Sequence, residues 1–110
     1  MANTFKNAAL ADVSNSSYET LYTTPTATQT VILGLAIANK SSQAVTVQVQ
    51  FRDGSASADF QLLDNVSIPA NTTLETLAGQ KYILEASDIL KVKAGTGSAL
   101  DVVLGFMEKA

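Results

Sequence analysis

Apolar and polar residues alternate along most of the chain, and this alternation predicts β-strands. In the stretch AVTVQVQF, residues 44–51, the side chains of Val45, Val47 and Val49 would lie on one side of an extended chain, with polar side chains on the other. Because successive side chains of a strand point to opposite faces, this pattern is typical of a strand with one face on a core. Similar stretches recur, separated by turns rich in Asn, Asp, Gly, Ser and Pro. We therefore expect about eight or nine short strands.

The fold expected from these strands is all-β, an antiparallel β-sandwich. No stretch carries a convincing helical pattern, so nothing would cover a parallel sheet. A jelly roll and an immunoglobulin-like sandwich both fit the strand pattern. The 110 residues suit a single domain, placed at 25–110 after an N-terminal arm or first-strand region at 1–24. That region holds Phe5, Leu10 and Tyr18 and is too apolar for a solvated tail, so it is expected to dock on its own sandwich or on a neighbour.

Two of the expected strands are apolar on both sides. They are VILGLAIAN at 31–39 and LDVVLGFME at 100–108, and each has a glycine in mid-strand, which often marks a close approach by another backbone. On the first strand, the side expected to face the core holds Val31, Leu33, Leu35 and Ile37. Loops or the N-terminal segment could cover the second, small-residue side, or another subunit could, most simply in a symmetric homo-oligomer. The candidate subunit-contact residues on that side are Ile32, Gly34, Ala36, Ala38, Val103, Gly105 and Met107.

Composition favours a folded domain that associates with other chains. Hydrophobic residues make up 46% of the chain and charged residues 15%, the reverse of a disordered composition, and so low a charge provides little repulsion between molecules. The net charge is −3 and the seven basic residues are scattered, so no nucleic-acid partner is expected. No apolar run suggests a membrane partner, and residues 1–13 carry no secretion signal, so we expect assembly in a cytoplasm.

The residues that usually carry chemistry are sparse. The chain has no histidine and no cysteine, which removes the commonest general base, the thiol nucleophile and the usual zinc ligands. Asp53 and Asp59 flank the sequence GSASA, but Asp53 followed by glycine is an ordinary turn pair, and the alternating oxygen ligands of a calcium loop are absent. We therefore expect no enzymatic activity, no catalytic residue, no cofactor and no metal. A glycan-binding, adhesin-type sandwich is an alternative that would use Tyr18, Tyr22 or Tyr82 in an exposed groove.

Five segments together resemble a known group of proteins. They are TLYTTP at 20–25, VILGLAIANKSSQAVTVQV at 31–49, IPANTTLETLAG at 68–79, ILEASDILKVKA at 83–94 and LDVVLGFME at 100–108. In this order they resemble small β-sandwich virion structural proteins of tailed bacteriophages, notably phages of cyanobacteria. In those relatives the turn after Ile-Pro often reads Ala-Gly, and the pair before the final strand-opening aspartate often ends in glycine. Asn71 and Ser87 stand at these positions here; asparagine tolerates left-handed backbone nearly as glycine does, so Ser87 is the larger departure.

The resemblance implies a non-enzymatic subunit of a phage particle, assembled in the host cytoplasm and located in the virion. The leading hypothesis is an oligomeric capsid decoration or cement protein, a homo-oligomer with a trimer among its open symmetries, bound to the major capsid protein or other virion proteins. The alternative within the particle is a neck or tail structural or adaptor protein. Copy number per particle would separate the two.

Overall fold

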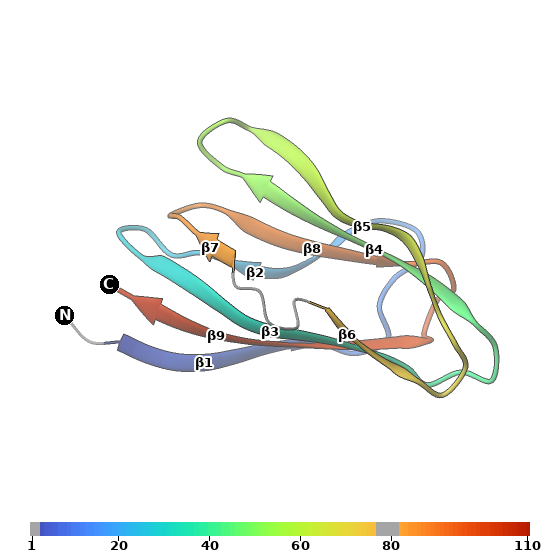
Figure 1. Cartoon of the computed structure of the whole chain (residues 1–110). Coiled ribbons are helices and arrows are strands. Elements are labelled where there is room, and N and C mark those ends of the chain that lie inside the picture. Colours follow the sequence, from blue (N-terminus) through green and yellow to red (C-terminus); the bar gives the residue numbers. More distant parts are fainter. Residues whose placement is uncertain (1–2, 77–81) are drawn as a thin grey trace.

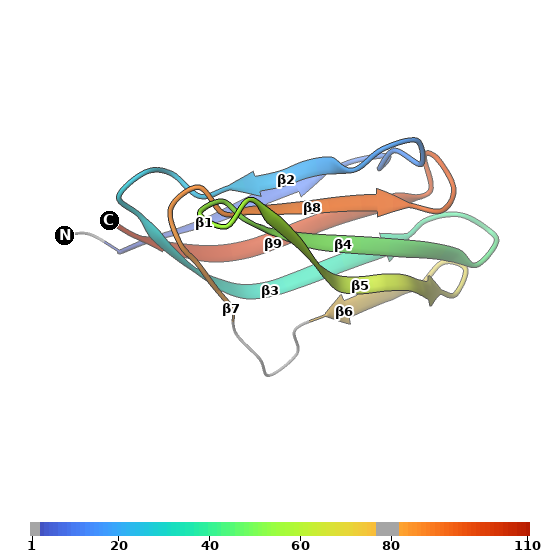
Figure 2. The ribbon, with the colours of Figure 1, turned by 90° about the horizontal axis from the view of Figure 1, so that it is seen from above.

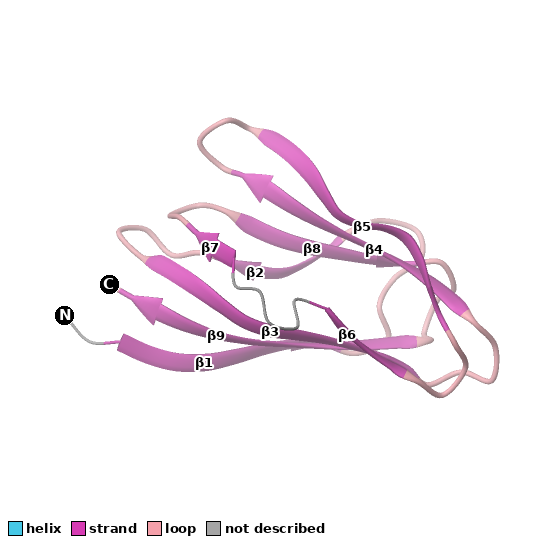
Figure 3. Ribbon diagram, in the orientation of Figure 1, coloured by secondary structure: helices cyan, strands magenta, loops and turns pink. Residues whose placement is uncertain are grey.

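The described part of the protein consists of strands, turns and loops. The computed structural model describes residues 3–76 and 82–110, and Figure 3 shows strands and loops in that part and no helix. The strands are β1 (Asn3–Leu10), β2 (Glu19–Thr23), β3 (Gln29–Asn39), β4 (Val45–Asp53), β5 (Ala58–Ile68), β6 (Thr73–Thr76), β7 (Tyr82–Leu84), β8 (Ile89–Ala94) and β9 (Leu100–Lys109). The all-β fold with about nine strands is therefore confirmed. Residues 77–79, the end of the third resembling segment (68–79), lie outside the described residues.

Two antiparallel sheets form the layers of a sandwich (Figure 1). One has the strand order β1-β9-β3-β6, with β7 also paired to β3, and the other has the order β2-β8-β4-β5. Strands β6 and β7 pair with successive stretches of β3, so together they occupy one edge position, as Figure 2 shows from above. Most connections cross from one sheet to the other. The β4–β5 hairpin joins neighbours in one sheet, and the successive strands β6 and β7 both belong to the other sheet. This order is that of a jelly roll rather than an immunoglobulin fold, which resolves the topology that the sequence left open.

The core lies between the sheets and uses the alternation seen in the sequence. Val45, Val47 and Val49 of β4 are buried, with glutamines and threonine on the other face of the strand. Strands β8 and β9 bury alternate residues in the same way, and for β4 and β9 the buried face is the one predicted from the sequence. The buried residues of β8 and β9 are Leu90, Val92, Ala94, Leu100, Val102, Leu104 and Phe106.

The N-terminal region belongs to the sandwich rather than standing apart from it. Strand β1 pairs with β9 along its whole length, from Asn3 beside Lys109 to Leu10 beside Val102. Strand β2 pairs with β8 in the opposite sheet. Between them Val13 is completely buried, and its backbone N–H donates to the carbonyl of Leu100 at 3.0 Å. This region therefore adds one strand to each sheet.

A β-bulge in β3 changes which side chains face the core. Ile32 pairs with Phe106 and Gly34 pairs with Gly105, so Leu33 is an extra residue without a partner on β9. The extra residue reverses the alternation: Ile32 is 0% exposed, whereas Leu33 is 44% exposed. The expectation that Ile32 lies on the small-residue side is therefore wrong, and so is the placement of Leu33 on the core side. Beyond the bulge, Leu35 faces the core as predicted.

The two positions that depart from the phage pattern both adopt left-handed backbone. Asn71 has a φ of 53° and Ser87 a φ of 73°. The turn at Ser87 forms without glycine because its neighbours hold it: the N–H of Ser87 donates to the carbonyl of Thr24 at 3.1 Å, and the buried carboxylate of Asp88 accepts from the N–H of Glu85 at 2.8 Å. Side-chain and backbone hydrogen bonds thus offset the cost of positive φ at serine.

Candidate interaction surface

The outer face of the β1-β9-β3 sheet is apolar. Cross-strand partners share a face, and the partners of buried residues point inward, so the register identifies the residues that point outward. We call this surface the apolar outer face. Its residues are Phe5, Ala9, Val31, Leu33, Gly34, Ala36, Ala38, Ile83, Val103, Gly105 and Met107.

This face holds most of the exposed large hydrophobic side chains of the described chain. Six large hydrophobic side chains are exposed in the described chain. Four of them belong to the apolar outer face: Phe5 at 73%, Leu33, Ile83 and Val103. They come from four different strands of one sheet, so they form a common surface rather than isolated positions. A contiguous apolar surface of this kind is typical of a site that another molecule covers.

A pair of glycines lies at the centre of the apolar outer face. Gly34 and Gly105 are cross-strand partners. A Cβ added to either would meet no atom within 4 Å, and neither glycine has the positive φ that would require it. Neither packing within the chain nor backbone conformation therefore explains these two glycines. The space above them is open, and another backbone or side chain can approach the sheet closely there.

The outer face of the other sheet is polar and carries cross-strand hydrogen bonds and ion pairs. The carboxylate of Asp59 lies 3.3 Å from both Arg52 and Lys91. The amide of Gln50 donates to Gln61 at 3.1 Å. The Arg52 and Lys91 hydrogen bonds lower the pKa of Asp59 although partial desolvation opposes them. The two outer faces of the sandwich thus differ sharply, and only the β1-β9-β3 sheet presents a surface suited to apolar contact.

Six of the seven contact residues predicted from sequence lie together on the apolar outer face. Ile32 is the exception and lies in the core. Sequence reasoning missed five residues of this face. Phe5, Ala9 and Ile83 are added by β1 and β7. Val31 and Leu33 of β3, which the alternation placed on the core side, also lie here. Strand pairing brings them there, and the chain carries no local signal for that pairing. Whether the six residues contact another subunit stays a prediction.

A cluster of polar side chains links β1, β2, β3 and β9. The ammonium of Lys6 lies 2.8 Å from the carboxylate of Glu108, and the hydroxyl of Tyr22 donates to the same carboxylate at 2.6 Å. The Tyr22 hydroxyl also lies 2.8 Å from that of Thr30. Burial, together with the Glu108 hydrogen bond, raises the pKa of Tyr22 to about 12. The Lys6 and Tyr22 hydrogen bonds hold the pKa of Glu108 below its usual value.

Replacing Glu108 by glutamine should destabilise the protein at neutral pH and much less in acid. The pKa of Glu108 is lower in the folded than in the unfolded chain, so its carboxylate adds stability above the unfolded-state pKa, and this stability is lost as the pH falls through the folded-state pKa. The difference in unfolding free energy between wild type and Glu108→Gln should therefore shrink between about pH 5 and pH 3. Urea unfolding at a series of pH values measures it. A difference that stays constant over this range would contradict the assignment.

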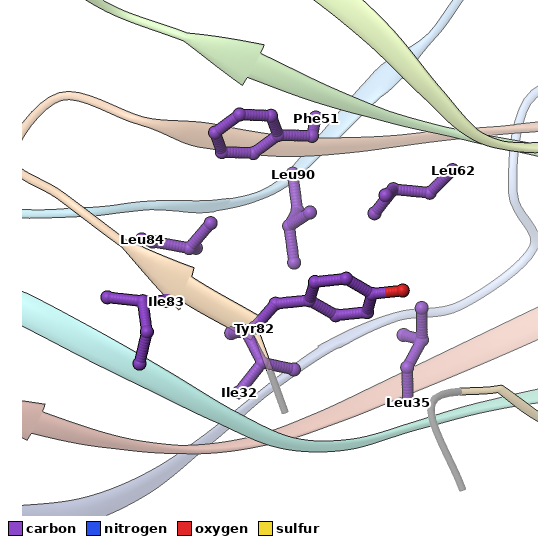
Figure 4. Close-up of a pocket in the computed structure, with 8 residues that line it drawn as sticks. All are labelled: Ile32, Leu35, Phe51, Leu62, Tyr82, Ile83, Leu84 and Leu90. Atoms are coloured by element: carbon purple, nitrogen blue, oxygen red, sulfur yellow. The ribbon is translucent and has the colours of Figure 1, made fainter. Parts of the chain in front are cut away.

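An apolar cavity of about 260 Å³ opens between the sheets near β7 (Figure 4). Its wall consists of seven aliphatic or phenyl side chains and Tyr82. Phe51 and Phe60 lie beside each other at this end of β4 and β5, with ring centroids 6.2 Å apart. The hydroxyl of Tyr82 is the polar side-chain group among these lining residues. The lining residues are Ile32, Leu35, Phe51, Leu62, Tyr82, Ile83, Leu84 and Leu90.

The three tyrosines of the glycan-binding alternative lie in different places. Tyr18 is near Lys93 and Gln61 on the polar outer face. Tyr22 packs its ring on Phe106, with centroids 4.2 Å apart, and Tyr82 lines the cavity. They do not combine into one aromatic groove.

Residues 3–76 and 82–110 contain no group of three or more carboxylate, histidine or cysteine side chains placed to hold a metal ion. Nor does this part contain a helix long and apolar enough to cross a membrane.

Comparison with known proteins identifies the fold. No family model and no curated protein matches the chain. A capsid structure of the Helicobacter pylori bacteriophage KHP30 matches with a TM-score of 0.56 and 10% identity over 98% of this chain and 87% of that one. Disulfide-linked pili of Bacillus endospore appendages match with a TM-score of 0.54 and 8% identity over 96% and 85%. The Drosophila NLP core, described with pentamer formation and histone binding, matches with 0.53 and 13% identity over 94% and 96%. At these identities the likeness is one of fold, which phage-capsid, appendage and other proteins share.

Proposed function

We propose that this protein is a non-enzymatic structural subunit of a bacteriophage particle, and that the protein attaches within the particle through its apolar outer face. The observation that carries this proposal is the contrast between the two outer faces, with an open pair of glycines, Gly34 and Gly105, on the apolar one. A capsid decoration or cement protein is the form that fits best. It would bind across junctions of the assembled shell and bury apolar area there. Because only the assembled lattice presents such a site, binding would stabilise the shell.

Two further observations support a role in assembly rather than catalysis. The sequence at 20–108 resembles small virion structural proteins of tailed phages, and the fold is one that a phage capsid protein and an appendage pilus protein also have. The lining of the cavity and the chain's lack of histidine and cysteine give a reaction few groups to use. A neck or tail position remains the alternative, since the same face could join a ring of subunits there.

Substituting arginine for Gly34 should remove the protein from particles. The added side chain would lie above the middle of the apolar outer face. No atom lies within 4 Å of the Cβ position, so we expect the substitution to leave the fold intact. Ser67→Arg is a matched control because Ser67 is exposed on the opposite sheet. Quantitative mass spectrometry of purified particles should give at least about tenfold fewer copies of Gly34→Arg than of wild type, and near-normal numbers of Ser67→Arg.

The same measurement separates the two positions in the particle. Wild-type copies that follow the number of capsid subunits indicate decoration, and a small ring multiple indicates the neck or tail. Equal incorporation of Gly34→Arg and wild type would overturn the proposal that this face is the attachment surface.

A further inference from the structure

Along β9, the outward-pointing residues, which include the apolar outer face and one charged residue at each end, are ordered about Gly105. From one end of the strand to the other they are an acid, an apolar residue, glycine, an apolar residue and a base: Asp101, Val103, Gly105, Met107 and Lys109. The glycine is at the centre of this series. Reversing the strand direction therefore exchanges the acidic end with the basic end and one apolar residue with the other.

Strand β1 crosses the same line. Its outward residues are Asn3, Phe5, Asn7 and Ala9, and Asn7 is the cross-strand partner of Gly105. A large apolar residue and a small one thus lie at equal distances on either side of the centre. The line through Asn7 and Gly105 continues to Gly34 on β3.

We propose that the apolar outer face binds a second copy of this chain about a twofold axis along the line from Gly34 through Gly105 to Asn7. This proposal rests on the proposed function and narrows it: the molecule that covers the apolar outer face in the particle is a second copy of this chain and not the shell itself. The axis lies in the interface, so each strand stacks on its own counterpart with the direction reversed. Such a contact is isologous: the same patch on both subunits is complementary to itself.

On β1 the arrangement places a large side chain over a small one, and on β9 it places apolar residues over each other and opposite charges at the ends. Phe5 of one copy lies over Ala9 of the second, and Val103 lies over Met107. At the centre, each glycine meets its own counterpart, so the sheets can approach closely there. Packed sheets are twisted relative to each other by about 30°, and the pairing is therefore closest near the axis.

Charge favours this orientation over the other way of stacking two copies. Asp101 lies 3.0 Å from Lys40, which also binds Asp12, and this cluster of two carboxylates and one ammonium keeps a negative charge. With the strands reversed, the cluster faces the Lys109 end of the second copy. With the axis along the strands instead, the two acidic clusters would face each other, which costs free energy between like charges.

The size of the surface indicates a contact of moderate affinity. The apolar outer face has eleven residues, fewer than the roughly 20–30 a side of a standard interface. We therefore expect a dimer with a Kd on the order of micromolar. An isologous contact closes at two copies, so dimers are expected in solution and not trimers.

Exchanging Phe5 and Ala9 tests the register of this contact. Both side chains are exposed, so Phe5→Ala, Ala9→Phe and the double exchange should fold like wild type, which circular dichroism melting checks. Each single variant should weaken the dimer on the order of tenfold, because one loses the aromatic contact and the other sets two phenylalanines against each other. The double variant rebuilds the Phe–Ala pair with the positions exchanged and should dimerise within about threefold of wild type.

Sedimentation equilibrium or light scattering at increasing concentration gives these dissociation constants. A double variant as weak as the weaker single one overturns the register, and a wild-type monomer at the highest soluble concentration, or a trimer, overturns the twofold contact. These failures are distinct from failure of the proposed function. If wild type is monomeric but Gly34→Arg is still lost from particles, the face binds another virion protein and only the twofold inference fails.

Discussion

Replacing Ile32 by alanine should lower the free energy of unfolding by about 2–5 kcal/mol. Ile32 is completely buried in the core between the sheets, where it contributes to the wall of the cavity near Leu35 and Leu90. Removing its outer carbons loses the transfer free energy of buried hydrocarbon and enlarges an existing cavity, whose walls cannot collapse fully. Urea unfolding followed by circular dichroism measures the loss.

Leu33→Ala is the matched control for this prediction. The two residues are neighbours of similar size on the same strand, but Leu33 is 44% exposed at the bulge. Its truncation should change monomer stability by less than about 1 kcal/mol. Strict alternation along β3 predicts the opposite ranking, with Leu33 buried and Ile32 outside. A larger loss for Leu33→Ala than for Ile32→Ala would therefore show that the bulge is absent.

Strand faces could be predicted wherever alternation continues without interruption. From Val45 to Val49 in β4 and from Leu100 to Phe106 in β9 every second residue is apolar and buried, so the pattern and the fold agree there. In β3 the alternation does not reveal the bulge, because Val31, Ile32 and Leu33 are all apolar and either register satisfies the sequence. Only pairing with β9 places the extra residue at Leu33. A run of large apolar residues therefore predicts a strand but not its inward face.

The apolar outer face could be predicted only in part for a similar reason. Gly34 and Gly105 fall at the centres of two apolar strands, and this local signal indicated a close approach. That these strands are neighbours, and that the glycines face each other, follows from the jelly-roll order, which alternation does not encode. Phe5 joined the face through β1, which the sequence placed in an arm. Long-range pairing decides which apolar residues share a surface.

A buried asparagine, Asn39, was not singled out from the sequence although its side chain links the β3–β4 turn to the end of β5. Asn39 is the last residue of β3, and the residue is 2% exposed. Its amide donates to the carbonyls of Gln43 and Ile68 at 2.8 and 2.9 Å. Its carbonyl oxygen accepts from both the N–H and the hydroxyl of Ser41 at 2.9 and 2.8 Å. In the sequence it precedes a polar turn, and nothing there distinguishes it from an exposed turn residue.

Asn39→Ala should therefore cost about 3 kcal/mol of unfolding free energy, far more than an ordinary turn substitution. The loss has two parts: the hydrogen bonds disappear, and the carbonyl of Ile68 is left buried without this donor. Ser41→Ala removes a single hydroxyl partner and should cost about 1 kcal/mol. Gln43→Ala keeps the accepting carbonyl, removes an exposed side chain and should change stability by less than about 0.5 kcal/mol. Urea unfolding of the three variants tests this order, and equal losses for Asn39→Ala and Gln43→Ala would contradict it.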